Sequence, residues 1–336
     1  MDTSFTAEQQ DLLGTAARLA GQLGPGTVQS LGDAARRARL AAAVDAAGLL
    51  QLREDDGSGS PAATGVEVGI VAGRLGRALA DTPFLGPTLA AEAFRLAGAG
   101  NRGAMTVALD RSGSGPAVWR ADATTGSLVI DADAGPAALG FIPDGDAFAL
   151  AVTDVGDTAT PVDLTRRTAV IPEGKAVRPV PGATLGHHDL GRLALLGQVI
   201  VCQDLAGVAE GAQALATGYA KTRHQYGAAI GSFQAVQHAL AEAAALTEGA
   251  ASMALFAAWS LDGLSQPEAR RAARAAKAYC AHAARQVCET AVQVHGGIGN
   301  TWECLAHLYL RRCLHSSELF GTGPHHLEHL ASELLG

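Results

Sequence analysis

The sequence has little charge and no cluster of basic residues. Only 17% of its 336 residues are charged, the formal net charge is −8, and no stretch gathers Lys and Arg as a phosphate-tracking surface does. Nucleic acid is therefore not an expected partner. Long apolar runs are also missing, because Gln203, Asp204 and Glu210 interrupt the most apolar stretch, 193–220, before it reaches the ~20 residues of a membrane span. We expect no transmembrane helix.

Signals for secretion, disulfides and metals are absent as well. The start, MDTSFTAEQQDLLGTAARLAG, has neither a basic region nor a continuous apolar one, so we expect a cytoplasmic protein. The five cysteines are odd in number and form no Cys-x-x-Cys pair, which favours reduced core cysteines. His325, His326 and His329 have no nearby helical Cys or carboxylate to complete a ligand set, so we expect no metal site.

The hydrophobic content is that of a globular protein. With 48% hydrophobic residues, the chain can bury a substantial core in two or three packed units. Apolar residues recur at three- and four-residue spacing in 6–23, 33–48, 63–80 and 85–97, and breaks rich in Gly, Pro and Asp separate these segments. The pattern predicts an N-terminal helical domain over residues 1–100.

The sequence pattern changes near residue 104 from helical periodicity to short β-branched runs. MTVALD, GSLVIDADA, AFALAVTD and TAVIP are short β-branched runs bounded by Gly, Pro and Asp, which predicts a middle β domain over 101–190. A C-terminal four-helix-type bundle is predicted over 191–336. Its helices are expected at 192–222, 232–262, 266–294, 303–319 and 325–334. The second of these is apolar around much of its circumference, so it should pack against several neighbours or a subunit contact. The expected fold class is α+β.

Two polar stretches stand out from this alanine-rich background. The first, YAKTRHQYGAAIGSFQAVQH at 219–238, places Arg223 at the end of one long helix and Gln234 at the start of the next. A guanidinium offers a planar fork of donors that suits a diphosphate. The structural alternative is an ordinary bundle turn in which Ser232 caps the following helix.

The second stretch is QVHGGIGNTWECLAHLYLRRCLHSSELFGTG at 293–323, which opens with Gln293 and a Gly-Gly-x-Gly run. Glycines reach positive φ and let backbone N–H groups approach a phosphate closely. Glycines also end helices without binding anything. Here the run follows a bundle helix and precedes Thr301, Trp302 and Glu303, which favours cofactor binding.

These two stretches resemble the acyl-CoA dehydrogenase superfamily, FAD enzymes that desaturate acyl thioesters between C2 and C3. The order of helical, β and bundle segments extends the resemblance over nearly the whole chain, and ALADTPFLGP at 78–87 is similar to the shorter bacterial members. The resemblance implies FAD as cofactor and an acyl-CoA or carrier-bound acyl thioester as substrate. It also implies a homo-oligomer or a heterotetramer with a homologous subunit, and an electron-transferring flavoprotein as a candidate acceptor.

The resemblance also assigns individual residues to FAD. The family's Arg-x-x-Phe-Gly turn contacts the pyrophosphate, and here Tyr226 replaces the Phe. A Phe-Gln or His-Gln pair reaches the adenosine half of an FAD held largely by a neighbouring subunit, and the Gln-x-x-Gly-Gly-x-Gly loop wraps the diphosphate. The cofactor-binding residues expected on this basis are Arg223, Tyr226, Phe233, Gln234, Gln293, Gly296, Gly297, Gly299 and Thr322.

The catalytic base is where the sequence departs from the family. The reaction needs a carboxylate to remove a proton at C2 while hydride leaves C3. Phe320 stands where the commonest Glu would be, and the alternative position, on the first helix of the C-terminal domain, falls at Gly197. Asp204, two turns further along that helix, is the remaining candidate base, although ~10 Å separates it from Gly197. An interhelical hydrogen-bond role is its alternative.

Three functions remain open on these grounds. The first is a flavoenzyme that uses Asp204 or another acid. The second is a base-deficient subunit that contributes Gln234 and the 293–299 loop to an FAD shared with a catalytic homologue. The third is a fold adapted to a non-redox biosynthetic step. Nothing between 104 and 140 resembles the family's flavin-ring motifs, so the adenosine side is the better matched half.

Overall fold

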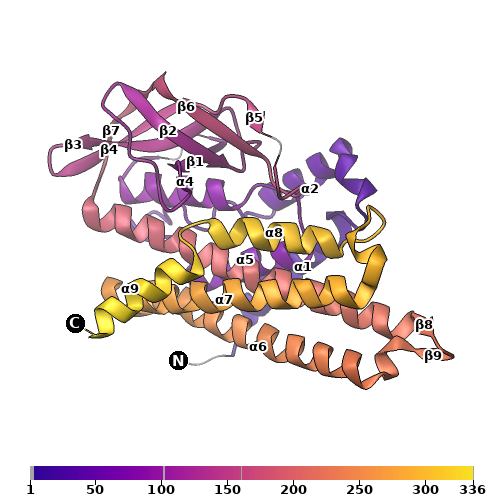
Figure 1. The fold of residues 1–336 in the computed structure, drawn as a ribbon. Helices are drawn as coiled ribbons and strands as arrows, with labels where there is room; N and C mark the ends of the chain where they lie inside the picture. Colours follow the sequence, from indigo (N-terminus) through magenta and orange to yellow (C-terminus); the bar gives the residue numbers. More distant parts are fainter. Residues whose placement is uncertain (1–3, 101–102, 160, 336) are drawn as a thin grey trace.

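The computed structural model describes residues 4–100, 103–159 and 161–335. Four helices come first, a seven-stranded sheet follows, and long helices form the remainder (Figure 1). The predicted α+β fold class is confirmed. The boundaries 100 and 190, as limits of separate domains, stay a prediction.

The N-terminal helices begin at side chains suited to that position. Thr6 and Thr64 open capping boxes with Gln9 and Glu67, and the Asp33 carboxylate accepts a hydrogen bond from the Arg36 N–H at 2.9 Å. The helices are α1 (Ala7–Leu23), α2 (Ala34–Ala46), α3 (Gly65–Arg77) and α4 (Leu85–Leu96), with a short 3₁₀ turn at Gln29–Gly32. All four lie within three residues of their predicted bounds, and the largest difference is the end of α3 at Arg77, where the prediction had 80.

The middle sheet is mixed. Strands β1 and β3 pair in parallel, and the other strand pairs of the sheet are antiparallel. Its strands are β1 (Met105–Asp110), β2 (Ala123–Ile130), β3 (Ala137–Asp144), β4 (Ala147–Asp154), β5 (Thr158–Ala159), β6 (Thr168–Ala176) and β7 (Arg178–Gly186), in the order β5-β6-β2-β1-β3-β4-β7. A small core around the buried Trp119 fills one face. The other face joins the main core, and α4 lies against β1.

The C-terminal helices make up the rest of the molecule. They are α5 (His187–Thr222), α6 (Gln234–Gly263), α7 (Gln266–His295), α8 (Ala306–Glu318) and α9 (Gly323–Leu335), with the β8–β9 hairpin (His224–Gln225 and Ala228–Ala229) between α5 and α6. Helix α5 starts at His187, five residues before its predicted start, because strand β7 runs directly into it. All five cysteines are free and buried, as predicted.

Two of these helices are long and apolar enough, by composition, to cross a bilayer. In α5 the most apolar window is 83% buried and forms the centre of the bundle, whereas in α6 it is only 22% buried. In the isolated chain α6 therefore presents small apolar side chains and Phe256 to solvent. Such a face needs a further covering surface. The expectation that no helix spans a membrane stays a prediction.

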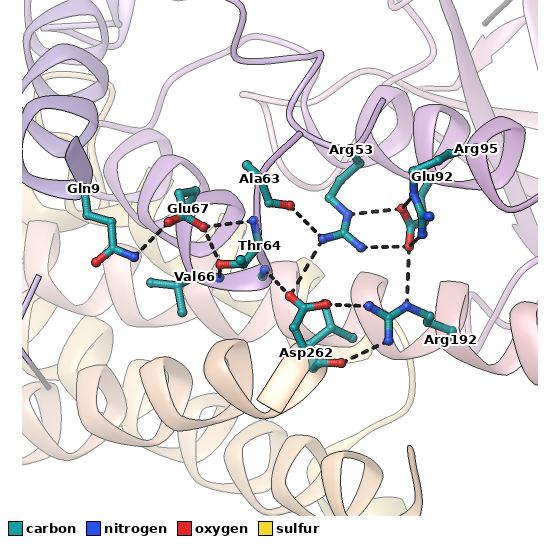
Figure 2. Close-up of polar contacts among 12 residues, drawn as sticks. Gln9, Arg53, Ala63, Thr64, Val66, Glu67, Glu92, Arg95, Arg192 and Asp262 are labelled. Atoms are coloured by element: carbon teal, nitrogen blue, oxygen red, sulfur yellow. Dashed lines mark hydrogen bonds and ion pairs between the residues drawn. The ribbon is translucent and has the colours of Figure 1, made fainter. Parts of the chain in front are cut away.

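A buried ion network joins the N-terminal helices to the bundle (Figure 2). Arg53 and Glu92 have fully buried side chains and are linked by two hydrogen bonds of 3.1 and 2.8 Å, while Arg95 donates to the same carboxylate. Arg192 of α5 pairs with Asp262 at the end of α6 and approaches Glu92 at 3.7 Å. Burial opposes ionisation of Glu92, but its two arginines prevail and lower its pKa. The network fixes the helical layers relative to one another.

Candidate functional site at the end of the bundle

The β8–β9 hairpin holds the first group of predicted cofactor residues at one end of the bundle (Figure 1). Arg223 caps α5, with its N–H donating to the Tyr219 carbonyl at 2.9 Å and its carbonyl accepting from the Ile230 N–H at 2.8 Å. Its guanidinium is exposed and forms no hydrogen bond or ion pair within the described chain. The Arg223 guanidinium is therefore exposed to solvent, while hydrogen bonds fix the backbone of this residue.

Tyr226 forms the tip of the hairpin and is 94% exposed, the highest value among the large hydrophobic residues of the described chain. Its backbone has a φ of 53°, a left-handed conformation that costs free energy in a non-glycine residue. Its ring meets Phe233 edge-on at 6.3 Å. Two exposed aromatic rings in the same turn as Arg223, whose guanidinium has no partner in the described chain, suit a planar, charged ligand.

Gln234 is the first residue of α6, and its side chain is exposed. The alternative explanation of this turn required Ser232 to cap α6. The Ser232 hydroxyl instead donates back to the Ala229 carbonyl at 2.7 Å, and the residue at the cap is Phe233, whose side chain forms no capping bond. Capping therefore does not account for the polar residues here.

The glycine loop lies at the same end of the bundle as the hairpin. Tyr219, one turn before Arg223, stacks on His295 at a centroid distance of 4.3 Å, and Gly296 follows immediately. Gly296 has a φ of 64°, and a Cβ at Gly297 would meet nothing within 4 Å, so the backbone of Gly297 is open to a ligand. Gly299 is different: a Cβ there would lie 2.8 Å from the Val292 carbonyl oxygen, so its role is the tight turn itself.

The bundle end fits the adenosine diphosphate half of FAD. It combines an unpaired guanidinium, the exposed amides of Gln234 and Gln293, and an uncovered glycine backbone. Thr322 is not part of this group. It precedes α9, which packs at Ala278 of α7, and fifteen residues of α7 separate Ala278 from Gln293, about 22 Å along the helix. The structure therefore brings together the residues at 223–234 and 293–297 and places Thr322 elsewhere.

The two positions where the family carries its base lie against each other. A Cβ on Gly197 would sit 2.2 Å from the Phe320 Cζ atom, so the phenyl ring rests directly on the α5 backbone. Phe320 is buried and has a φ of 57°. Its N–H donates to the Gly113 carbonyl at 2.8 Å, and the buried Lys277 ammonium donates to the carbonyls of Ser317 and Gly321. An aromatic ring, locked in place, occupies the volume that a carboxylate would need.

Replacing Gly197 by Ala tests this packing. The added methyl group would overlap the Phe320 ring, so we expect the free energy of unfolding to fall by about 1–3 kcal/mol. Urea unfolding of the variant measures the loss, and the double variant Gly197→Ala, Phe320→Leu should recover part of it. A fully stable Gly197→Ala protein would show that the ring does not rest there.

Asp204 does not have the surroundings of a general base. Its side chain is 2% exposed and receives hydrogen bonds from Arg312 at 3.0 and 2.6 Å and from the Ser316 hydroxyl at 2.7 Å, while Arg166 lies at 3.0 Å. Burial opposes its ionisation, but the two arginines and these hydrogen bonds prevail and lower the pKa of Asp204 to about 2. Both carboxylate oxygens are engaged, so the geometry supports the structural alternative in place of the catalytic expectation.

The same cluster fills the interior between α4, α5 and the sheet. The cavity lined by Phe84, Ile200, Asp204 and Arg312 is only about 10 Å³, room for one water molecule and none for an acyl chain. Sequence reasoning missed Arg166 and Arg312 as partners of Asp204. The available signal was the rarity of an unpaired carboxylate in so apolar a helix, which required buried cations somewhere in the chain.

Comparison with known proteins agrees with this architecture. Residues 195–335 match the family model described as acyl-CoA dehydrogenase, C-terminal domain. The chain is 30% identical over 302 residues to the acyl-CoA dehydrogenase IpdE2 of Mycolicibacterium smegmatis. The alignment covers 87% of this chain and 85% of that relative. The chain therefore belongs to the acyl-CoA dehydrogenase family.

Solved structures share the fold at lower sequence identity. One is the ChsE4–ChsE5 complex from Mycobacterium tuberculosis, with a TM-score of 0.82 and 24% identity over 100% of this chain and 99% of that one. Another is an acyl-CoA dehydrogenase complexed with FAD from Bacillus anthracis, with a TM-score of 0.78 and 17% identity over 99% of this chain and 67% of that one.

Proposed function

We propose that this chain is a subunit of an FAD-dependent acyl-CoA dehydrogenase and that it shares its FAD with a homologous chain carrying the catalytic carboxylate. The observation that carries the proposal is the Phe320 ring resting on Gly197. The interior around Asp204 supports it, because both Asp204 oxygens accept structural hydrogen bonds and the cavity lined by Asp204 is only about 10 Å³.

The residues of this chain would bind and orient the cofactor. Arg223 would match the diphosphate charge, the Gly297 backbone would approach the phosphate oxygens, and Gln234 would donate to the adenosine side. When bound, FAD supplies the acceptor for the hydride that leaves C3 of the acyl thioester. The proton at C2 would pass to the homologous subunit's carboxylate, since Phe320 and Gly197 leave this chain without an acid at either of the family's base positions.

Assembly with a homologue is supported by the surface of α6. Only 22% of its most apolar window is buried in the isolated chain. The ChsE4–ChsE5 structure is a complex of two different chains on this fold, and the relative IpdE2 is named an acyl-CoA dehydrogenase. A CoA or carrier-bound acyl thioester as substrate, an electron-transferring flavoprotein as acceptor and a cytoplasmic location remain parts of the proposal.

Co-purification with a homologous subunit tests the function. We expect flavin in the assembly to be bleached anaerobically by a saturated acyl-CoA. Replacing the homologue's glutamate before its Gly-Thr by Gln should slow bleaching by at least about 100-fold, the scale of a lost general base. Unchanged bleaching in that variant would place the base in this chain, and an assembly without flavin but with activity would indicate the non-redox alternative.

A further inference from the structure

A pocket of about 630 Å³ opens between α2, the start of α4 and the start of β1. Its volume lies in the range of sites that hold organic ligands. All of its described lining falls between residues 34 and 134. The pocket is therefore separate from Arg223 and Gln234 at the bundle end and from the contact between Gly197 and Phe320, on which the proposed function depends.

The walls of this pocket are mostly short apolar side chains. Helix α2 contributes alanines at 34, 38, 41 and 42, whose spacing of three, four and seven residues places them on neighbouring faces of the helix. From the other side come Pro83, Pro87 and Ala90, and Leu50 and Met105 add larger apolar groups. Because alanine and proline side chains are short, they leave room that the apolar body of a ligand could fill.

The polar groups of the pocket are mainly hydrogen-bond acceptors. Gln51 donates its amide to the Asp45 carboxylate at 2.8 Å, which leaves the Gln51 Oε1 atom buried and without a partner in the described chain. A buried carbonyl oxygen costs free energy until a donor reaches it. Glu54 follows one turn later, its N–H donating to the Gln51 carbonyl at 2.9 Å. In total the described lining has three carboxylates, the third on Asp133, and one guanidinium, on Arg37.

The one guanidinium lies away from the acceptors. Arg37 and Asp45 are on the same face of α2 but eight residues apart, about 12 Å along the helix. Asp133 interacts with Arg37, yet burial and the Asp131 charge raise its pKa. Negative charge is therefore in excess even near the guanidinium, and the end of the pocket at Asp45 favours a cation.

We propose that this pocket binds an organic amine, a primary ammonium on an apolar body. The ammonium donates to the Gln51 Oε1 atom and its charge is balanced by Asp45 and Glu54, while the apolar body lies between the alanines of α2 and the prolines at 83 and 87. A neutral or anionic ligand of the same shape would not balance these carboxylates. The site goes beyond the proposed function and does not depend on it.

Calorimetric titration of the full chain, in whatever assembly it purifies, tests the site with probes of one shape. 2-Phenylethylamine, 2-phenylethanol and phenylacetate share a phenyl ring on a two-carbon chain and differ in charge. We expect the amine to bind at least about tenfold more tightly than the alcohol, the scale of a hydrogen bond to a charged group, and phenylacetate to bind more weakly than both. Ethylamine, which lacks the ring, should bind at least about tenfold more weakly than 2-phenylethylamine.

Two sets of variants distinguish this site from binding elsewhere on the protein. Ala38→Trp should fill the pocket and weaken amine binding at least about fivefold, whereas Ala35→Trp, at an exposed alanine of α2 outside the pocket, should leave it unchanged. The double variant Asp45→Asn, Glu54→Gln should reduce the advantage of the amine over the alcohol to less than about threefold while the alcohol still binds. No amine binding at about 10 mM, an amine that binds no more tightly than the alcohol, or equal effects of the two tryptophan substitutions would overturn the proposal.

Discussion

Replacing Asp204 by Asn is expected to lower the free energy of unfolding by about 3–5 kcal/mol while leaving the rate of flavin reduction in the folded assembly within about twofold. The loss arises because Arg166 and Arg312 would keep their charges in a buried site without the carboxylate that balances them. The rate should persist because both carboxylate oxygens accept structural hydrogen bonds and the cavity lined by Asp204, about 10 Å³, is too small for an acyl chain.

Urea unfolding and stopped-flow flavin reduction measure these two effects separately. Asp154→Asn is a suitable control, because its ion pair with Arg178 is largely exposed and should contribute less than about 1 kcal/mol. A stable Asp204→Asn protein whose flavin is no longer reduced would restore Asp204 as the base and contradict the structural role.

Replacing Arg223 by Ala is expected to raise the dissociation constant for FAD by roughly 10- to 150-fold. A hydrogen bond to a charged group contributes about 1.5–3 kcal/mol, and nothing else in the hairpin supplies a guanidinium to the diphosphate. Folding should be unaffected, because the side chain is exposed and has no partner in the described chain.

Fluorescence titration of the flavin-stripped assembly gives the dissociation constant. Arg271→Ala removes an exposed arginine near the opposite end of α7 and serves as the matched control. If both variants bind FAD as tightly as the unmodified assembly, Arg223 does not contact the diphosphate. Other residues must then bind it.

The helices could be predicted closely because their periodicity and end signals are local. Strand β3 was missed, since Gly135 and Pro136 before it, and Gly140 and Pro143 within it, looked like turn residues. In the fold Gly140 is required by Trp119, whose ring would lie 2.6 Å from a Cβ there. That requirement comes from a residue 21 positions earlier, which a local pattern cannot contain.

The candidate site also has a part that the sequence could mark and a part that it could not. The residues at 223–234 and 293–297 form two continuous motifs, so the sequence could mark both, and the Tyr219–His295 stack joins them. The Asp204 cluster draws on Arg166, Arg312 and Ser316, which are 38, 108 and 112 residues away along the chain. No spacing rule links such positions, so an isolated acid was interpreted as a catalytic candidate.

The structural role of Phe320 could be seen only in the fold. In the sequence it was a missing glutamate, and Gly197 was a second missing glutamate 123 positions earlier. The fold shows that one substitution fills the space left by the other, and that Lys277, Gly113 and His326 hold the loop in place. A site without a carboxylate at either position is what a subunit that contributes cofactor contacts alone would have.

The most direct test of the account is the ratio of FAD to this chain. The chain purified alone should be colourless or lose its flavin readily, and the assembly with a catalytic homologue should contain one FAD for each pair of unlike chains. Absorbance of the released flavin, set against the protein composition, gives both values. A yellow homo-oligomer that retains one FAD per chain and is bleached by a saturated acyl-CoA would contradict the account.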